Sequence, residues 1–476
     1  MFPFQWSIKG FEHQIFSEQI SLKNIDYALY SNWERSVEPT SKFDSDVIYN
    51  ERNYFYEFVH DALYDSGDEN SLVRHFERKE TKEGDVSYVI NCGGKVYELK
   101  VYAININLYS TGVGMLSFYL NNEKYPDPSD VLMINQVGRR VFPPFIASVE
   151  DRGILANSIE IKGLQGKITG YIEDFSRYTN KTKNNMPASF LVDMIHEVAK
   201  NIDVKPVVDD RMFLQCWYKN DEWTNAFKND YESFLNSNPW YEFVFVDKLN
   251  DISCKNKDMQ YKLIKEATYE RWQENGSLYG ISRYSMMYTT SMECPKFLLD
   301  NFETMYARMA ELILVQKASV LRFSAEVTNI SKMDVEKDFS EKVSSLYKEY
   351  IRFVNQIHFR EVSAQDQGIE LYQMLYGVMN IGEHVSKLDE EISELHTYVS
   401  LREDRRKNST MELLTTIATI AVPLTVVAGF FGMNNKGLND EKGDYFYNYG
   451  LNQFYIAILV AIIISVLIWF IKRSKK

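Results

Sequence analysis

Apolar residues are concentrated at the C-terminal end of this 476-residue chain. Two stretches there, residues 413–431 and 454–471, contain no charged side chain. At about 1.5 Å per helical residue, each is long enough to cross a hydrocarbon layer of about 30 Å. The pattern therefore predicts two membrane-spanning helices at the end of an otherwise polar chain.

Charged residues around these stretches predict their orientation. Basic residues stand before the first stretch and after the second, while the loop between them, residues 432–453, carries more acidic than basic residues. Because Lys and Arg collect on the cytosolic side of a membrane, we expect both chain ends in the cytosol and the loop outside. The chain would then be a multi-pass protein of the inner (plasma) membrane.

Seven apolar residues upstream of the first stretch alternate at spacings of three and four, which is typical of a coiled-coil seam. They are Val378, Ile381, Val385, Leu388, Ile392, Leu395 and Val399. Residues 361–431 contain no proline except Pro423, so the pattern predicts one stalk helix that continues into the first span. Two spans cannot enclose an ion path, so a pore would need a ring of subunits joined by this seam. The alternative is a helix that packs within its own subunit.

The N-terminal part of the chain has a different pattern. Runs rich in β-branched and aromatic residues predict strands over 86–92, 96–103, 115–120 and 241–246. From about residue 296, apolar residues recur at helical spacing. We therefore expect a cytosolic α/β domain over 1–295, with a linker at 176–185, followed by a helical segment over 296–360. The stalk with the first span would cover 361–431 and the outer loop 432–453. The second span would cover 454–471 and a basic tail 472–476.

Charge and reactive residues exclude some functions. The net charge is −13, and residues 401–476 hold ten basic against six acidic side chains, so the first 400 residues carry about −17. Such an acidic body argues against nucleic-acid binding, which needs a basic face. The four cysteines lack a metal-binding spacing and the seven histidines lie far apart, so we expect no enzyme.

Three motifs follow one another at the first span. Residues 408–415 read Asn-Ser-Thr-Met-Glu-Leu-Leu-Thr, residues 423–425 read Pro-Leu-Thr, and residues 428–434 read Ala-Gly-Phe-Phe-Gly-Met-Asn. With two C-terminal spans and a short outer loop, this order resembles the CorA family of divalent-cation channels. The resemblance implies an α+β membrane protein that assembles as a funnel-shaped homopentamer. It also implies that Mg²⁺ or another divalent cation is the transported ion.

The resemblance assigns residues to the ion path. The pore-lining residues would be Asn408, Met411, Leu414, Val422 and Thr425. The outer mouth would be Gly432, Met433 and Asn434, where amide oxygens can hold a hydrated ion. The loop residues Asp440, Glu441 and Asp444 would gather cations at the mouth. Two alternatives stay open: Thr425 bonds only to its own helix, and the loop carboxylates are ordinary solvated charges.

Two clusters in the N-terminal domain are candidates for ligand binding. Thr111, Gly112 and Gly114 can bring backbone amides close to an anion, and Arg139 and Arg140 can supply positive charge. The alternative is a strand turn and a surface basic pair.

The N-terminal body and residues 272–280 resemble a divergent branch of CorA-like proteins that is encoded beside type III CRISPR systems. That resemblance implies an antiviral effector gated by a nucleotide second messenger, such as an S-adenosylmethionine–AMP conjugate. The alternative is an ordinary Mg²⁺ (or Zn²⁺, Co²⁺ or Ni²⁺) transporter regulated by intracellular metal. The stalk offers the carboxylates of Asp389, Glu390, Glu391 and Glu394 as candidate sensors of such a metal; the alternative is the solvated flank of a coiled coil.

Overall fold

The computed structural model describes two compact units, Met1–Ser393 and Glu394–Lys476. The described residues are 1–27, 32–37, 45–141, 155–165, 170–175, 187–208, 211–247, 249–333 and 337–432, with short pieces between 455 and 466. The predicted linker, residues 176–185, lies outside them.

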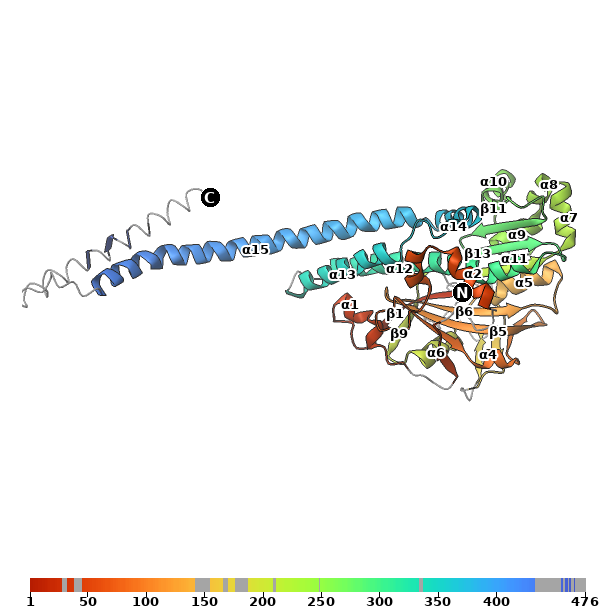
Figure 1. The fold of residues 1–476 in the computed structure, drawn as a ribbon, viewed down its shortest axis with the longest axis horizontal. Coiled ribbons are helices and arrows are strands. Elements are labelled where there is room, and N and C mark those ends of the chain that lie inside the picture. The colour runs from red at the N-terminus through yellow and green to blue at the C-terminus, as the bar shows by residue number, and fades with distance from the viewer. Residues whose placement is uncertain are drawn as a thin grey trace, which may run out of the picture. The chain divides into compact units, whose positions relative to one another are not determined.

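The first unit is built on a large sheet, here called sheet A, in which every described strand pair is antiparallel (Figure 1). Its strand order is β8-β7-β4-β5-β6-β1-β9, and β3 pairs with both β5 and β2. The strands are β1 (Phe2–Ile8), β2 (Trp33–Arg35), β3 (Val73–Arg78), β4 (Ser87–Cys92), β5 (Lys95–Tyr109), β6 (Val113–Asn121), β7 (Ser158–Lys162), β8 (Tyr171–Asp174) and β9 (Ile202–Pro206). The strands predicted over 86–92, 96–103 and 115–120 are confirmed as β4, β5 and β6.

Short helices accompany sheet A. They are α1 (Phe16–Gln19), η1 (Leu22–Asn24), α2 (Ser45–Tyr54), η2 (Glu57–Val59), α3 (His60–Leu63), α4 (Glu80–Glu83), α5 (Pro128–Gly138) and α6 (Ser189–Val198). In α5, Asp127 caps the helix by accepting a hydrogen bond from the backbone N–H of Ser129, and Pro128 occupies the first turn, where its missing N–H does no harm.

A second, smaller sheet, here called sheet D, has the order β10-β13-β12-β11. Its strands are β10 (Leu214–Lys219), β11 (Thr268–Tyr269), β12 (Ser277–Ser282) and β13 (Ser285–Thr290). Beside it lie α7 (Asp221–Asn229), α8 (Tyr231–Leu235), α9 (Asn238–Phe245) and α10 (Lys257–Ala267) (Figure 1). Trp223, Trp240 and Phe243 form the aromatic centre of the core between these helices and the sheet.

The strand predicted over 241–246 is wrong, because these residues belong to helix α9. Pro239 stands in its first turn, which suits a helix start, and Val246 ends it with a φ of 50°. Residues 240–244 of α9 are all buried, so this run lacks the alternation that separates strands from buried helices. Only the pair β10–β13 is parallel among the described strands. The N-terminal domain is therefore α+β, which corrects the α/β prediction.

The helical half begins where the sequence predicts it. It contains α11 (Lys296–Asn301), the π-helical turn η5 (Phe302–Tyr306), α12 (Ala307–Ser331), α13 (Lys337–Gln356), α14 (Asp366–Val378) and α15 (Ile381–Gly432). Helix α12 contacts β1 and β6 of sheet A, and α13 and α14 pack against α12.

The sequence pattern predicts one continuous stalk helix from residue 361, but the structure divides this stretch into two helices. Helix α14 ends at Val378, and α15 starts at Ile381 after a break at Met379 and Asn380. Asn380 has a φ of 52°, a left-handed conformation that asparagine adopts more readily than most residues. The backbone therefore leaves the helix here without proline or glycine at the break.

A buried network of polar side chains joins sheet A to α12. The Arg308 guanidinium lies 3.3 Å from the Glu51 carboxylate and 3.8 Å from that of Glu311. Glu311 also accepts hydrogen bonds from Asn107 and from the Tyr109 hydroxyl of β5. One buried cation thus compensates two buried carboxylates, and such charges are stable in a protein interior only when all of them are paired.

Candidate ion-path helix and ligand pocket

Helix α15 carries all five predicted pore-lining residues. Its 52 residues correspond to about 78 Å of helix. At 100° per residue, the five side chains fall within about one third of its circumference. They are Asn408, Met411, Leu414, Val422 and Thr425, and all are exposed in the single chain. The structure therefore places the predicted pore residues on one open helix face.

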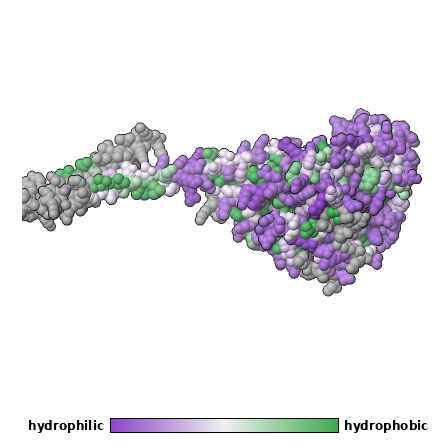
Figure 2. Space-filling view, in the orientation of Figure 1, coloured by the Kyte–Doolittle hydropathy of each residue, from purple (hydrophilic) through white to green (hydrophobic). Residues whose placement is uncertain are grey.

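The C-terminal part of α15 exposes apolar side chains, part of which form a hydrophobic strip on the face seen in Figure 2. The large ones are Met411, Leu413, Leu414, Ile417, Ile420, Val422 and Val426. An apolar surface of this extent requires an apolar environment or a partner.

Among the described residues, no helix is both long enough and apolar enough to cross a membrane. Several side chains of 413–431 and most of 454–471 lie outside those residues, so both spans stay predictions. Met433, Asn434, Asp440, Glu441 and Asp444 also lie outside them, and Gly432 is the last residue of α15.

The threonines of this part of α15 bond to their own helix. Thr425 Oγ1 donates to the carbonyl oxygen of Ala421 at 2.6 Å, and Thr415, Thr416 and Thr419 make the same bond four residues back. This is the alternative role stated for Thr425. Such bonds satisfy the hydroxyl without water and accompany Pro423, which has no N–H to donate within the helix.

Part of the predicted seam is buried by the first unit itself. Ile381, Val385, Leu388 and Ile392 of α15 are at most 9% exposed in the single chain. The Tyr350 hydroxyl of α13 donates to the Val385 carbonyl at 3.3 Å, which locates this packing within the subunit. Val378 belongs to α14 rather than to α15. These contacts favour the within-subunit alternative for this stretch, and a seam between subunits stays a prediction, also for Leu395 and Val399.

Two basic residues hold the junction of α14 and α15. Arg283 Nε, in the β12–β13 turn, donates to the Val378 carbonyl at 3.1 Å. Lys317 Nζ of α12 donates to the Met379 carbonyl and to His384 Nδ1, both at 3.0 Å. Cationic donors at a helix C-terminus satisfy its last carbonyls and its dipole. Burial lowers the pKa of His384, which keeps its ring neutral and able to accept this bond.

The predicted anion loop is a buried hairpin turn. Thr111 Oγ1 lies 2.8 Å from Ser319 Oγ of α12, and the Gly112 N–H donates to Tyr109 O. A Cβ on Gly112 would lie 2.5 Å from Ile20 Cγ2 and 2.7 Å from Arg322 Nε, and one on Gly114 would meet the Phe4 ring. Neighbouring side chains therefore fill the space beside these glycines.

Arg139 and Arg140 lie elsewhere on the domain. The Arg139 guanidinium is 5.3 Å from the centre of the Tyr284 ring, and Arg140 forms a β-bridge with Arg211. The structure thus packs Thr111, Gly112 and Gly114 against α12, and places the arginines next to other elements. A ligand-binding role of either cluster stays a prediction.

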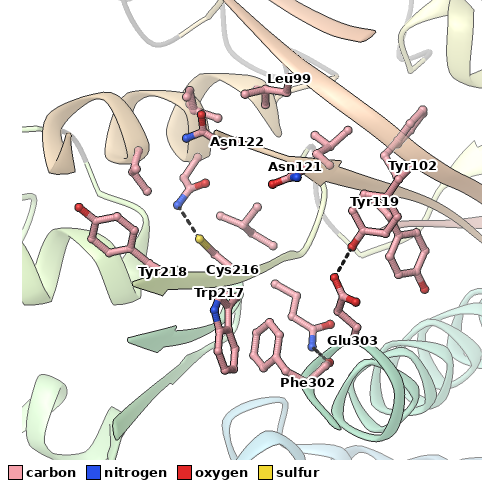
Figure 3. Close-up of a pocket in the computed structure, with 18 of the residues that line it drawn as sticks. Leu99, Tyr102, Tyr119, Asn121, Asn122, Cys216, Trp217, Tyr218, Phe302 and Glu303 are labelled. Atoms are coloured by element: carbon pink, nitrogen blue, oxygen red, sulfur yellow. Dashed lines mark hydrogen bonds between the residues drawn. The ribbon is translucent and has the colours of Figure 1, made fainter. Parts of the chain in front are cut away.

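Sequence reasoning missed a cavity of about 1000 Å³ in the first unit. It lies between sheet A, α5, β10 and the α11–η5 segment (Figure 3). Its lining includes Leu99, Tyr102, Tyr119, Asn121, Asn122, Cys216, Trp217, Tyr218, Phe302 and Glu303. The volume is at the upper end of the range for small-molecule sites. The lining comes from segments far apart in the sequence. It is rich in aromatic residues and includes Arg139, one of the residues predicted to bind a ligand.

The π-helical turn η5 forms part of the pocket wall. The Gln215 side chain donates to the Phe302 carbonyl at 2.8 Å, and the Tyr102 hydroxyl donates to the Glu303 carboxylate at 2.8 Å. Both sheets thus bond to this one turn. π-Helical turns inside longer helices occur frequently at functional sites.

The indole N–H of Trp217 lacks a hydrogen-bond acceptor among the described residues around this pocket. The Trp217 ring stacks on Tyr288 with centroids 4.3 Å apart, and its N–H is enclosed. A buried N–H without an acceptor is destabilising by about 1–3 kcal/mol. Burial raises the pKa of the neighbouring Cys216 thiol to about 11, so the thiol is protonated at neutral pH.

Metal-sensing carboxylates are not gathered into a site in the part of the chain that the structure describes. No three His, Cys, Asp or Glu side chains converge there around a point that could hold a metal ion. Asp389, Glu390, Glu391 and Glu394 are exposed along α15. Their role in sensing stays a prediction.

Comparison with known proteins connects this architecture to a family. Residues 293–473 match the family model described as "CorA-like Mg2+ transporter protein". The Bacillus subtilis (strain 168) protein named "Putative metal ion transporter YfjQ" is 35% identical over 106 residues, which is 20% of this chain and 30% of that protein. The chain thus spans about a third of this curated relative.

A solved structure, the CorA magnesium transporter from Methanocaldococcus jannaschii, aligns with 40% of this chain and 69% of its own. The identity is 15% and the TM-score 0.20, so this likeness supports no argument about the fold. The matched family is one of transporters, in agreement with the prediction that the chain is not an enzyme. Residues 293–473 of this chain are therefore similar to the CorA-like Mg2+ transporter family.

Proposed function

We propose that the chain is a CorA-like transporter of divalent metal cations, anchored by two spans at 413–431 and 454–471. The observation that carries this proposal is the family match over 293–473, which includes the helices α12 to α15 and both apolar stretches. The open apolar surface of α15 supports it, because lipid or neighbouring copies would cover that surface.

The ion path would be enclosed by several copies of the chain, and a homopentamer is what the resemblance implies. Met411 and Leu414 would form apolar constrictions that close by dewetting. Gly432 ends α15, and the Asn434 amides would hold a hydrated ion at the outer mouth. Mg²⁺ loses its water reluctantly, so neutral amide oxygens suit it better than a tight cage of carboxylates.

The acidic N-terminal domain would regulate transport. Regulation by intracellular metal is the option that the comparisons favour, since the matched family and the named relatives concern metal transport. Gating by a nucleotide second messenger in antiviral defence rests on sequence resemblance alone and stays a prediction.

The experiment is divalent-cation flux through the purified chain in liposomes, with Asn434→Ala compared against Asn435→Ala. A ring of amides that contributes about 1.4 kcal/mol at the mouth predicts about tenfold lower Mg²⁺ flux in the first variant. The neighbouring asparagine serves as the control and should leave flux near that of the parent. Equal flux in both variants would remove Asn434 from the ion path.

The same liposomes separate the two kinds of regulation. Flux that falls as Mg²⁺ rises on the side of the N-terminal domain supports control by metal. A pore that stays closed until a nucleotide is added would instead support the messenger hypothesis.

A further inference from the structure

The lining of the cavity in the first unit includes none of the predicted ion-path residues. Its lining residues lie between Met1 and Ala307, and none belongs to α15. What the cavity binds therefore has to be argued from its own lining, and that argument does not depend on whether the chain transports ions.

The lining describes the kind of molecule that would fit. The wall around Trp217 and Phe302 is aromatic, and flat rings pack on such surfaces (Figure 3). Trp217 offers one enclosed N–H that has no acceptor among the described residues, so the occupant should bring one. Charged side chains of both signs also line the cavity: Lys100, Glu123, Arg139, Lys219, Lys296, Asp300 and Glu303.

We propose that this pocket binds a small molecule with a flat heteroaromatic ring, which accepts a hydrogen bond from Trp217 Nε1–H. The ring would lie against Trp217 and Phe302, after a small turn of the indole towards it. Substituents of the ring would extend towards the charged residues.

The position of η5 gives such a ligand a route to the CorA-like region. The ring would contact Phe302, and η5 continues directly into α12. Helix α12 supplies Lys317, which bonds to the α14–α15 junction. Ligand binding would thus stabilise one arrangement of the π-helical turn at the start of the transporter region.

The test uses two probes of the same shape, quinoline-6-carboxylate and 2-naphthoate, of which only the first has a ring nitrogen that can accept a hydrogen bond. Dissociation constants are measured on the full chain in detergent by saturation-transfer NMR. The quinoline probe should bind about three- to tenfold more tightly, which is the usual worth of one such bond. Trp217→Phe keeps the packing and should reduce quinoline binding to the naphthoate level.

Trp272→Phe is the matched control. Trp272 lies on an exposed loop outside the pocket, and its indole N–H already donates to Gln367 at 3.0 Å. This variant should bind both probes as the parent does. No binding of either probe, equal binding of the two probes by the parent chain, or unchanged quinoline binding by Trp217→Phe would each overturn the proposal.

Discussion

Gly112 shows how much one residue can constrain the N-terminal domain. Its φ of +74° lies in the left-handed region, and its missing side chain lets Ile20 and Arg322 approach the β5–β6 turn. Gly112→Ala should therefore lower the free energy of unfolding by about 2–4 kcal/mol, from strain and overpacking together.

Gly94→Ala is the matched comparison for this prediction. Gly94 has a similar φ of +83°, but nothing lies within 4 Å of an added Cβ. Gly94→Ala should lower the free energy of unfolding by only about 1–2 kcal/mol, because it strains the backbone without overpacking. Thermal unfolding of the full chain in detergent measures both variants, and equal midpoints would contradict the packing at Gly112.

His358 predicts a dependence of stability on pH. Burial, reinforced by the Arg360 charge, lowers its pKa from the usual 6.5 to about 4 in the folded chain. Below pH 6.5 the unfolded chain binds a proton that the folded chain does not. Stability should therefore be complete above pH 6.5 and fall, by about 1–2 kcal/mol, as the pH approaches 4.

The measurement is the unfolding midpoint between pH 7 and pH 4.5 for the parent chain and for His358→Gln. The variant keeps a polar partner for the Tyr376 hydroxyl, which lies 3.0 Å from His358 Nε2. Its midpoint should change less with pH than that of the parent. Identical slopes would show that another group titrates.

At the scale of elements, the packing of α15 changes how its seam must be tested. Leu388 and Ile392 are each 1% exposed in the single chain. Replacing both by Asp places charge in this packing, so the first unit should lose several kcal/mol of stability. Thermal unfolding together with mass photometry distinguishes the outcomes. An unfolding midpoint equal to that of the parent, together with loss of the oligomer, would support packing of the seam between subunits.

Element prediction succeeded where side-chain pattern decides the structure. The β-branched runs of β4, β5 and β6 alternate or stand between turn glycines, so the strands follow from local chemistry. The run 240–244 in α9 is buried on every side and shows no clear period, so its type depends on packing against sheet D. The break at Asn380 was missed because no proline or glycine marks it. Contacts from Lys317 and Arg283, distant in sequence, hold it in place.

At the scale of the molecule, the N-terminal domain depends for its stability on residues of the stretch 293–473, which matches the family model. Removing residues 293 onward would delete Arg308 and Glu311, and so leave the Glu51 carboxylate without its cation and the Asn107 amide N–H without its acceptor. A fragment of residues 1–393 should therefore unfold cooperatively, whereas a fragment of residues 1–292 should aggregate. Circular dichroism and size exclusion compare them. A cooperatively folded 1–292 fragment would contradict this dependence.

The two candidate sites, the helix face of α15 and the pocket, differ in how far the sequence predicts them. That the five candidate pore residues share one helix face could be predicted, because they lie on one helix whose period is known; their role in a pore stays a prediction. The pocket could not, since Leu99, Asn121, Trp217 and Phe302 come together only through the arrangement of two sheets and η5. Charge and composition carry no information about such a juxtaposition.

The buried network between sheet A and α12 also sets an order of events during synthesis. Asn107 and Glu311 are separated by 204 residues, and Glu51 and Arg308 by 257. At about 5–20 residues per second, the ribosome needs roughly 10–40 s after Asn107 before Glu311 exists. The sheet must remain soluble through that interval, and the apolar stretch at 413–431 is made soon afterwards. Completion of the N-terminal domain and delivery of the chain to a membrane would therefore overlap in time, so chaperones and the insertion machinery would act on the same nascent chain.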